Sequence, residues 1–496
     1  MTFRYLLPFY FITAILLFAA LPAGAQTGTG DAPALTTEQI LDRVVARENA
    51  LISSLAKYTP MIETYIQNLE PDDELGTVPK SDKYFLGKLN LKDGVSERSL
   101  LPEPGFGNSL KTLLTQFYSV RYSPSGFAQM ILLDGKRFDR DRYLFEYVRQ
   151  EFLGEVRCFV FDVQPNPKVK DASFIGRIWV EDQGYNVVRF NGTYRPSETA
   201  KMFFHFDSWR EQMGAGQWLP AYIYSEESDL RYFFGTRKLR FKGLTRIWGY
   251  RAEQPKAEGD LLQRLQKAGL LAPEGEVDKV LQTVVTNLEV TNNLSIDPET
   301  RARVLLTSPL ESFSVGHTIV VSRGLIDVLP DEASLAMVLA HELAHISLGH
   351  GLDTEYAFAN LHAKRDKKEE READRLALEF LKNSPYKDKL GNAGLFLRAL
   401  HERAGKLPNL LKSRMGNRLT RAKDLMRTAP KLETTKVEQV AALPLGGRLR
   451  VDPWSNRVEL VKTKPVVLRS AREKMPFEVT PVFLQLTRQK QQEAQK

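Results

Sequence analysis

The residues of this chain with the clearest chemistry are His341, Glu342 and His345, in the pattern His-Glu-Leu-Ala-His. The surrounding stretch, residues 331–350, is apolar on nearly every side and contains no proline, which predicts one buried helix that starts at an aspartate cap and ends by Gly351. Two imidazoles and a carboxylate in a buried helix need partners, because an unpaired buried polar group costs roughly 1–3 kcal/mol. A bound metal ion is the predicted partner.

Helical spacing also predicts the role of each residue. Positions four apart lie on one face, so His341 and His345 can direct ring nitrogens at one zinc ion about 2.0–2.1 Å away. Glu342 is rotated by about 100° from His341. It therefore flanks the metal without binding it, where a general base for a zinc-bound water would lie. The pattern predicts one Zn²⁺ per chain.

A catalytic zinc takes three protein ligands and keeps one position open, so a third ligand is expected elsewhere. The next helical stretch, Lys367–Leu381, carries Glu370 and Asp374 on one face, four residues apart. We expect Glu370 to bind zinc and Asp374 to accept a ring N–H from a ligating histidine, with His341 preferred. The neighbouring glutamates lie off this face: Glu369 and Glu372. The alternative for so charged a run is a solvated helix face.

These motifs together resemble a known family of zinc metallopeptidases. The segment from about Val277 to Leu381 is similar to peptidase family M48, a gluzincin family that contains the CAAX prenyl proteases, the membrane heat-shock proteases and soluble bacterial envelope proteases. The likeness is carried by Ser322-Arg-Gly-Leu-Ile-Asp-Val-Leu329, Asp331-Glu332, Val338-Leu-Ala-His-Glu-Leu-Ala-His345 with His350 beyond it, and Glu370-Arg-Glu-Ala-Asp374. It implies zinc ligands at His341, His345 and Glu370, a general base at Glu342 and an outer hydrogen-bond partner at Asp374.

The chain departs from the family pattern at the substrate side. Where the family usually has Asn-Ala-Phe and Pro-Gly-Gly, this chain has Glu311-Ser312-Phe313 and Val315-Gly316-His317. A His-Pro pair often found before the closing helices is missing from residues 412–421.

The resemblance implies a zinc-dependent endopeptidase that hydrolyses unfolded or misassembled proteins. Substrate is expected to add as a strand to an edge strand formed by Thr318, Ile319, Val320, Val321 and Ser322, a mode that reads main-chain shape more than sequence. The candidates for contacting the transition state or substrate are His350, Arg421 and His317. For His350 the alternative is an imidazole interacting with the dipole at a helix C-terminus.

The N-terminus predicts export. Residues 1–25 combine a basic residue, a long apolar run and Ala-Gly-Ala, which is typical of a cleaved signal peptide and of a periplasmic or secreted protein; an uncleaved membrane anchor is the alternative. No later stretch is apolar enough to span a membrane. Cys158 is the only cysteine, so no intrachain disulfide can form in an oxidising compartment.

The net charge of +8 raises the question of an anionic partner. An exported chain seldom meets nucleic acid, so we expect none. Peripheral contact with an anionic envelope surface or a merely solvated surface are the remaining explanations.

The expected fold class is α+β: a mainly helical metallopeptidase unit with a small edge-stranded sheet, preceded by an antiparallel β-rich domain. The predicted divisions are a signal peptide (1–25), a helical region and linker (26–105), the β-rich domain (106–253), a linker (254–276), the metallopeptidase domain (277–435), and a β segment with a disordered tail (436–496).

The β-rich domain is expected to be a sheet of about eight strands with one solvated face. Its clearest signal is a hairpin, Phe174–Glu181 with Tyr185–Tyr194, joined by Asp182-Gln-Gly184. It faintly resembles the half-barrels that carry lipoproteins in bacterial envelopes. This supports a rival hypothesis, in which the sheet is a protein- or lipid-binding carrier and the zinc unit is structural or weakly active.

Overall fold

The computed structural model describes residues 35–488 except for short segments. These segments are 74–75, 92–95, 101–123, 136, 196–203, 214–216, 233–236, 251–260, 353–365, 412–425, 432, 434–438, 440–441 and 462–476. The predicted signal peptide at residues 1–25 therefore lies outside the described residues. None of the helices in the described part of the chain combines the length and the apolar character needed to cross a membrane.

The N-terminal region is mostly strand rather than helix. After α1 (Thr37–Leu55) come β1 (Met61–Asp72), β2 (Gly76–Asn90) and β3 (Ser96–Ser99), so the helix predicted in region 26–105 is present as α1, and strands replace the rest of the predicted helix and linker over 61–99. In the sequence, the spacing of Ile62 and Ile66 fits a helix. Two residues four apart share a face in a strand as well as in a helix, so this spacing could not decide between them.

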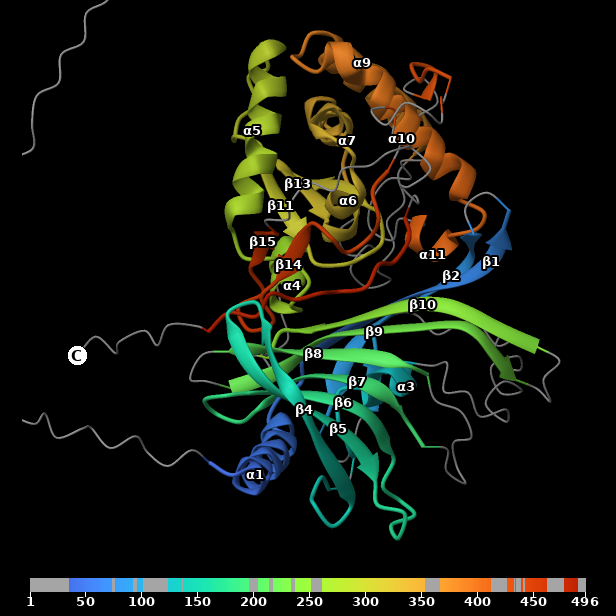
Figure 1. Cartoon of the computed structure of the whole chain (residues 1–496). Coiled ribbons are helices and arrows are strands. Elements are labelled where there is room, and N and C mark those ends of the chain that lie inside the picture. Colours follow the sequence, from blue (N-terminus) through green and yellow to red (C-terminus); the bar gives the residue numbers. More distant parts are fainter. Residues whose placement is uncertain are drawn as a thin grey trace, which may run out of the picture.

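The strands that follow are β4 (Tyr143–Leu153), β5 (Val156–Pro165), β6 (Phe174–Glu181), β7 (Val187–Tyr194), β8 (Phe206–Met213), β9 (Gln217–Tyr232) and β10 (Arg237–Trp248). Among the described residues, ten strands form one strongly curved antiparallel sheet in the order β3-β2-β1-β10-β9-β8-β7-β6-β5-β4 (Figure 1). The predicted hairpin is present as β6 and β7. The apolar run Phe127–Leu133 fits a strand in the sequence, but α3 (Pro124–Gln129) and a turn occupy it.

Both faces of the sheet are covered along β1 and β8, which corrects the expectation of one solvated face there, whereas the edge strand β4 is mostly exposed or half-buried. Along β1, Met61 and Tyr65 belong to a core cluster shared with the metallopeptidase unit. Ile62 and Ile66, which point to the other face, belong to a second cluster that includes Val44 of α1 and many aromatic side chains. Covering both faces makes the sheet an integral layer of the protein.

The metallopeptidase unit stacks on one face of this sheet (Figure 1). Its helices surround a small sheet of β11 (Arg301–Leu305), β12 (Ser312–Val315) and β13 (Thr318–Ser322). The helices are α4 (Leu261–Lys267), α5 (Glu276–Thr291), α6 (Arg323–Val328), α7 (Glu332–Ser347), α9 (Lys367–Lys382), the 3-10 helix η2 (Lys387–Lys389), α10 (Leu390–Arg403) and α11 (Pro408–Leu411).

The strand expected to bind substrate is not at the edge of its sheet. Within residues 301–322, all of which are described, the strand order is β11-β13-β12. β13 pairs in parallel with β11 and antiparallel with β12. Its residues Ile319, Val320 and Val321 are fully buried, as expected of a central strand. The prediction that Thr318–Ser322 is an edge strand is therefore wrong, and β12 is the edge near α7.

Buried polar contacts join the large sheet to the metallopeptidase unit. Glu63 of β1 accepts hydrogen bonds from Arg323 Nη2 at 2.9 Å and from the Ser308 backbone N–H at 2.6 Å. The residue after Arg323 must be a glycine, Gly324, because a Cβ there would lie 1.8 Å from the Ser308 carbonyl oxygen. At the other end of the contact, Asp82 of β2 accepts from the backbone N–H of Leu410 at 2.7 Å. The two parts therefore pack as one body.

The C-terminal segment lies between the two parts (Figure 1). β14 (Leu449–Val451) pairs antiparallel with β15 (Val458–Leu460). Residues 462–476 of the predicted C-terminal β segment lie outside the described residues. Arg488, placed by prediction in the disordered tail, donates hydrogen bonds to Glu181 at 2.9 Å and to Asp182 at 2.8 Å. The segment is thus held to the large sheet up to its last described residue.

Candidate metal centre

Helix α7 holds the central motif rigidly. Its Asp331 cap accepts from the Ser334 backbone N–H at 2.8 Å, as predicted for an N-cap. At the same end of the helix, the Asn392 amide donates to Asp331 at 2.5 Å, and the Tyr386 hydroxyl donates to Glu332 at 2.8 Å. Every residue of α7 from Ala333 to His345 is buried.

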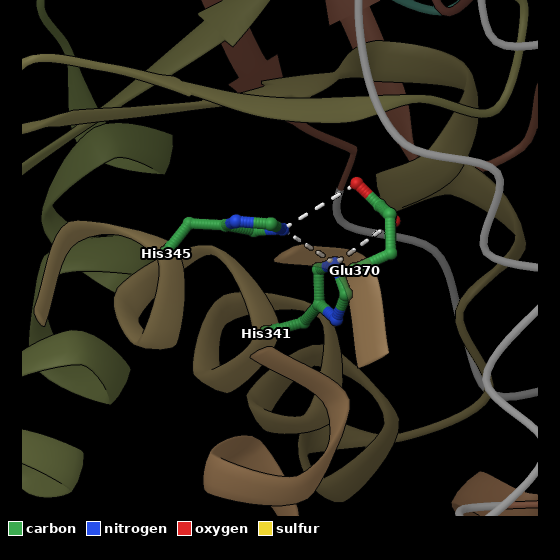
Figure 2. Close-up of side chains that lie close together, drawn as sticks. All are labelled: His341, His345 and Glu370. Atoms are coloured by element: carbon green, nitrogen blue, oxygen red, sulfur yellow. Dashed lines mark hydrogen bonds and ion pairs between the residues drawn. The ribbon is translucent and has the colours of Figure 1, made fainter. Parts of the chain in front are cut away.

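The two histidines and Glu370 converge on one point (Figure 2). The Nε2 atoms of His341 and His345 lie 3.2 Å apart. Carboxylate oxygens of Glu370 lie 3.7 Å and 3.6 Å from these two nitrogens. Atoms bound tetrahedrally to zinc at about 2.0–2.1 Å would be roughly 3.3–3.4 Å apart. The donor set and its spacing therefore fit a zinc ion.

Helix α9 supplies both carboxylates expected of it. Asp374 Oδ1 lies 2.9 Å from Nδ1 of His341, on the opposite side of the ring from Glu370. Burial opposes protonation of His341, but the hydrogen bond to Asp374 and the charges of Glu342 and Glu370 outweigh it and raise the pKa to about 9. The cluster is thus a strongly negative environment, which favours a bound cation.

Strand β12 holds the side chain of Glu342. The Ser312 hydroxyl donates to Oε1 of Glu342 at 2.8 Å, and both residues are fully buried. Ser312 lies on the edge strand of the small sheet. The carboxylate of Glu342, on α7, is thus fixed against the edge strand of the small sheet.

Of the other candidates, His350 and His317 are described and do not belong to this group of three ligands. His350 contacts His345 through Nδ1, on the far side of that ring from Glu370. It therefore does not fit the predicted contact with a transition state. His317 lies in the turn between β12 and β13, where its carbonyl accepts from the Arg301 backbone N–H at 2.8 Å. Arg421 lies outside the described residues.

Sequence reasoning missed two residues near the site. Ser312 was noted only as a departure from the family pattern, because a short Ser-Phe-Ser-Val strand has no clear period. Glu372 was placed off the ligand face, yet its Oε2 lies 3.7 Å from Nε2 of His350. The spacing of His350 five residues after His345 was the available signal, since a helix end that turns back can bring the two rings together.

A buried HExxH helix with a carboxylate from a second helix is a donor set that could hold the metal of a zinc metallopeptidase. Peptidase family M48 matches residues 273–362, and this part of the chain belongs to that family. The match includes α5, the small sheet, α6 and α7 and stops before α9. The assignment of Glu370 and Asp374 therefore rests on their geometry. No curated protein matches the chain.

Three crystal structures align with the chain at low similarity. A LolA superfamily protein from Nitrosomonas europaea aligns at 11% identity and a TM-score of 0.23, covering 45% of this chain and 96% of that one. A putative outer membrane lipoprotein-sorting protein domain from Vibrio parahaemolyticus aligns at 12% identity and a TM-score of 0.27, covering 46% of this chain and 99% of that one. A DUF1329 family protein from Desulfovibrio piger aligns at 9% identity and a TM-score of 0.22, covering 44% of this chain and 94% of that one. These TM-scores carry no conclusion, so the likeness of the sheet to lipoprotein carriers stays a prediction.

Proposed function

We propose that this protein is a zinc endopeptidase of the bacterial cell envelope that hydrolyses unfolded or misassembled proteins. The observation that carries the proposal is the buried convergence of His341, His345 and Glu370, with Glu342 beside them. A structural zinc site is normally closed by four protein ligands, whereas three protein ligands leave a position for chemistry.

Each residue of the site has its own role in the proposed reaction. Zinc held by the three ligands would supply Lewis-acid chemistry, polarising a carbonyl and making water more acidic. Glu342 takes the proton of the attacking water and passes it to the leaving amine. The Ser312 hydroxyl orients the carboxylate for both transfers through its hydrogen bond to Oε1. Asp374 keeps the proton of His341 on Nδ1, which leaves Nε2 for the metal.

Strand β12 is the proposed substrate-binding strand, in place of β13. Among the described strands β12 pairs only with β13. A substrate strand added along its other edge would use main-chain hydrogen bonds, which accept many sequences. It would also pass Ser312, and therefore the carboxylate of Glu342. This arrangement suits extended, unfolded chains.

The proposed location is the periplasm or the exterior, with residues 1–25 removed. The support is the charge and apolar pattern of that segment. Unfolded proteins are the proposed partners, without nucleic acid, and contact with anionic envelope surfaces is a secondary proposal that rests on the net charge of +8. N-terminal sequencing of the mature protein tests the location, and a chain that still begins at Met1 and pellets with membranes would favour the anchor.

The decisive experiment measures zinc content and cleavage of unfolded casein in parallel, for the wild type and for Glu342→Gln. We expect the variant to keep its zinc, because Glu342 is not a ligand, and to lose 10²–10⁴-fold or more in cleavage rate. Cleavage at the wild-type rate by a zinc-loaded variant would reject the peptidase mechanism. The carrier hypothesis would then explain the protein better.

A further inference from the structure

His350 lies behind one of the zinc ligands. Its Nδ1 is 2.9 Å from Nδ1 of His345, and the two ring centroids are 5.1 Å apart. The Nε2 atom of His345 points to the opposite side, toward His341 and Glu370. His350 thus contacts the histidine that binds metal in the proposed function without reaching the metal position.

The end of α7 is built to produce this contact. Leu348 is the C-cap and Gly349 has a φ of +70°, a left-handed conformation that favours glycine. The backbone N–H of His350 bonds to the carbonyl of His345, and that of Gly349 bonds to the carbonyl of Ile346, both at 3.0 Å. This pair of bonds is the Schellman motif. It folds His350 back over the last turn, onto the ring of His345.

Proton positions follow from the contact. If Nε2 of His345 binds zinc, its remaining proton is on Nδ1, so Nδ1–H donates and Nδ1 of His350 accepts. The proton of a neutral His350 is then on Nε2, which faces Glu372 Oε2 at 3.7 Å. The reverse arrangement, with His350 donating, would place a proton on Nε2 of His345 and block metal binding.

We propose that His350 is a positioning residue that fixes the tautomer and ring orientation of His345, with Glu372 supporting it. The inference rests on the proposed zinc function. It gives the two histidine ligands matching supports from α9: Asp374 contacts His341 directly, and Glu372 reaches His345 through His350. The His350 side chain is only 10% exposed, so the contact is sheltered from competing water.

The alternative for His350, an interaction of its imidazole with the dipole of α7, makes a different prediction. An imidazole at a helix C-terminus stabilises the helix through its charge and needs no contact with His345. Replacing it would then lower thermal stability without changing the affinity for zinc. A positioning role changes zinc affinity, typically 10–100-fold for the outer partner of a metal-binding histidine.

The test compares two replacements of the full-length mature protein. His350→Asn places an amide oxygen close to the position of Nδ1 and keeps an acceptor, while His350→Leu removes it. Zinc affinity is measured by competition with a chelator, and folding by circular dichroism. We expect His350→Leu to bind zinc 10–100-fold more weakly and His350→Asn to stay within about threefold of the wild type. Equal affinity in all three proteins, or equal loss in both variants, would overturn the proposal.

A second pair of variants tests the outer support and covers the case in which His350→Leu does not fold. Glu372→Ala is expected to weaken zinc binding by a few-fold, since a 3.7 Å separation is longer than a direct hydrogen bond. Glu379→Ala, an exposed glutamate on the same helix, is the matched control and should change nothing. Equal zinc affinity for these two variants would reject the role of Glu372. Absence of zinc from the wild type would instead reject the proposed function itself.

Discussion

The Ser312 hydroxyl donates a hydrogen bond to Oε1 of Glu342 at 2.8 Å in a fully buried setting. It links the edge strand of the small sheet to the general base of the proposed reaction. The family pattern noted in the sequence usually has alanine at this position, which has no hydroxyl to donate. A hydrogen bond to an ionised partner contributes roughly 1.5–3 kcal/mol.

Replacing Ser312 should therefore affect chemistry more than binding. For Ser312→Ala we expect kcat to fall about tenfold, because about 1.4 kcal/mol of orientation is lost, with little change in KM or zinc content. Ser312→Thr keeps the hydroxyl and should restore most of the rate. Steady-state kinetics on a fluorogenic peptide would show this. A rise in KM at constant kcat would mean that Ser312 binds substrate and does not orient Glu342.

The choice of Glu370 as third ligand predicts a sharp contrast along α9. Glu370→Gln should lose zinc during dialysis, because a neutral amide is a much poorer ligand, while Glu369→Gln should retain it. Asp374→Asn should weaken zinc binding by 10–100-fold through the orientation of His341. Metal analysis of the dialysed proteins provides the measurement. Similar losses in the glutamate variants would show that the ligand is misplaced.

The buried pair of Glu63 and Arg323 predicts that the large sheet and the metallopeptidase unit unfold together. Both side chains are only 1% exposed, so removing Glu63 takes away the nearer of two buried carboxylates and leaves Arg323 with Asp327 at 3.5 Å. We expect Glu63→Ala to lower the free energy of unfolding by about 3–5 kcal/mol. Asp229→Ala, which breaks the exposed pair with Lys238, should cost less than about 1 kcal/mol. Denaturant unfolding followed by circular dichroism distinguishes them, and two separate transitions in the wild type would contradict the prediction.

The turn between β6 and β7 predicts a dependence of stability on acid. Burial alone raises the pKa of Glu181, but the N–H groups of Gly184, Asn186 and Gln183 outweigh it and hold the pKa below its ordinary value. A folded pKa below the unfolded value of about 4.3 means that the carboxylate stabilises the fold above that pH. This stability is lost as the pH falls through the folded pKa.

Glu181→Gln should therefore be less stable than the wild type at pH 7, by about 1–3 kcal/mol, and less sensitive to acid. The exposed Glu146→Gln is the control and should follow the wild type. Urea unfolding between pH 3 and 7 gives the comparison. Parallel curves for the wild type and Glu181→Gln would show that the carboxylate has the same pKa in both states.

The metal cluster was predictable from the sequence because its chemistry is local. His341, Glu342 and His345 lie within one and a half turns of helix, and helical geometry alone places the two imidazoles on one face. Glu370 and Asp374 repeat the same spacing on α9, and the structure brings that face to the histidines. The hairpin of β6 and β7 was predictable for a similar reason, since its turn residues and strand alternation are adjacent in the chain.

The substrate side and the supports of the site were decided by tertiary structure. Whether β13 is an edge strand depends on β12, which is too short to show a hydrophobic period in the sequence. The polar residues of β1 are buried only because both faces of the sheet are covered there, so the sequence does not mark β1 as a strand. The contacts of Ser312 with Glu342 and of Glu372 with His350 each join separate elements. The residues of the motifs determined which metal chemistry is available, through the spacing of a single helix. The packing of distant strands and helices determined which side chains contact that site: the Ser312 hydroxyl, the His350 imidazole and, through His350, the Glu372 carboxylate.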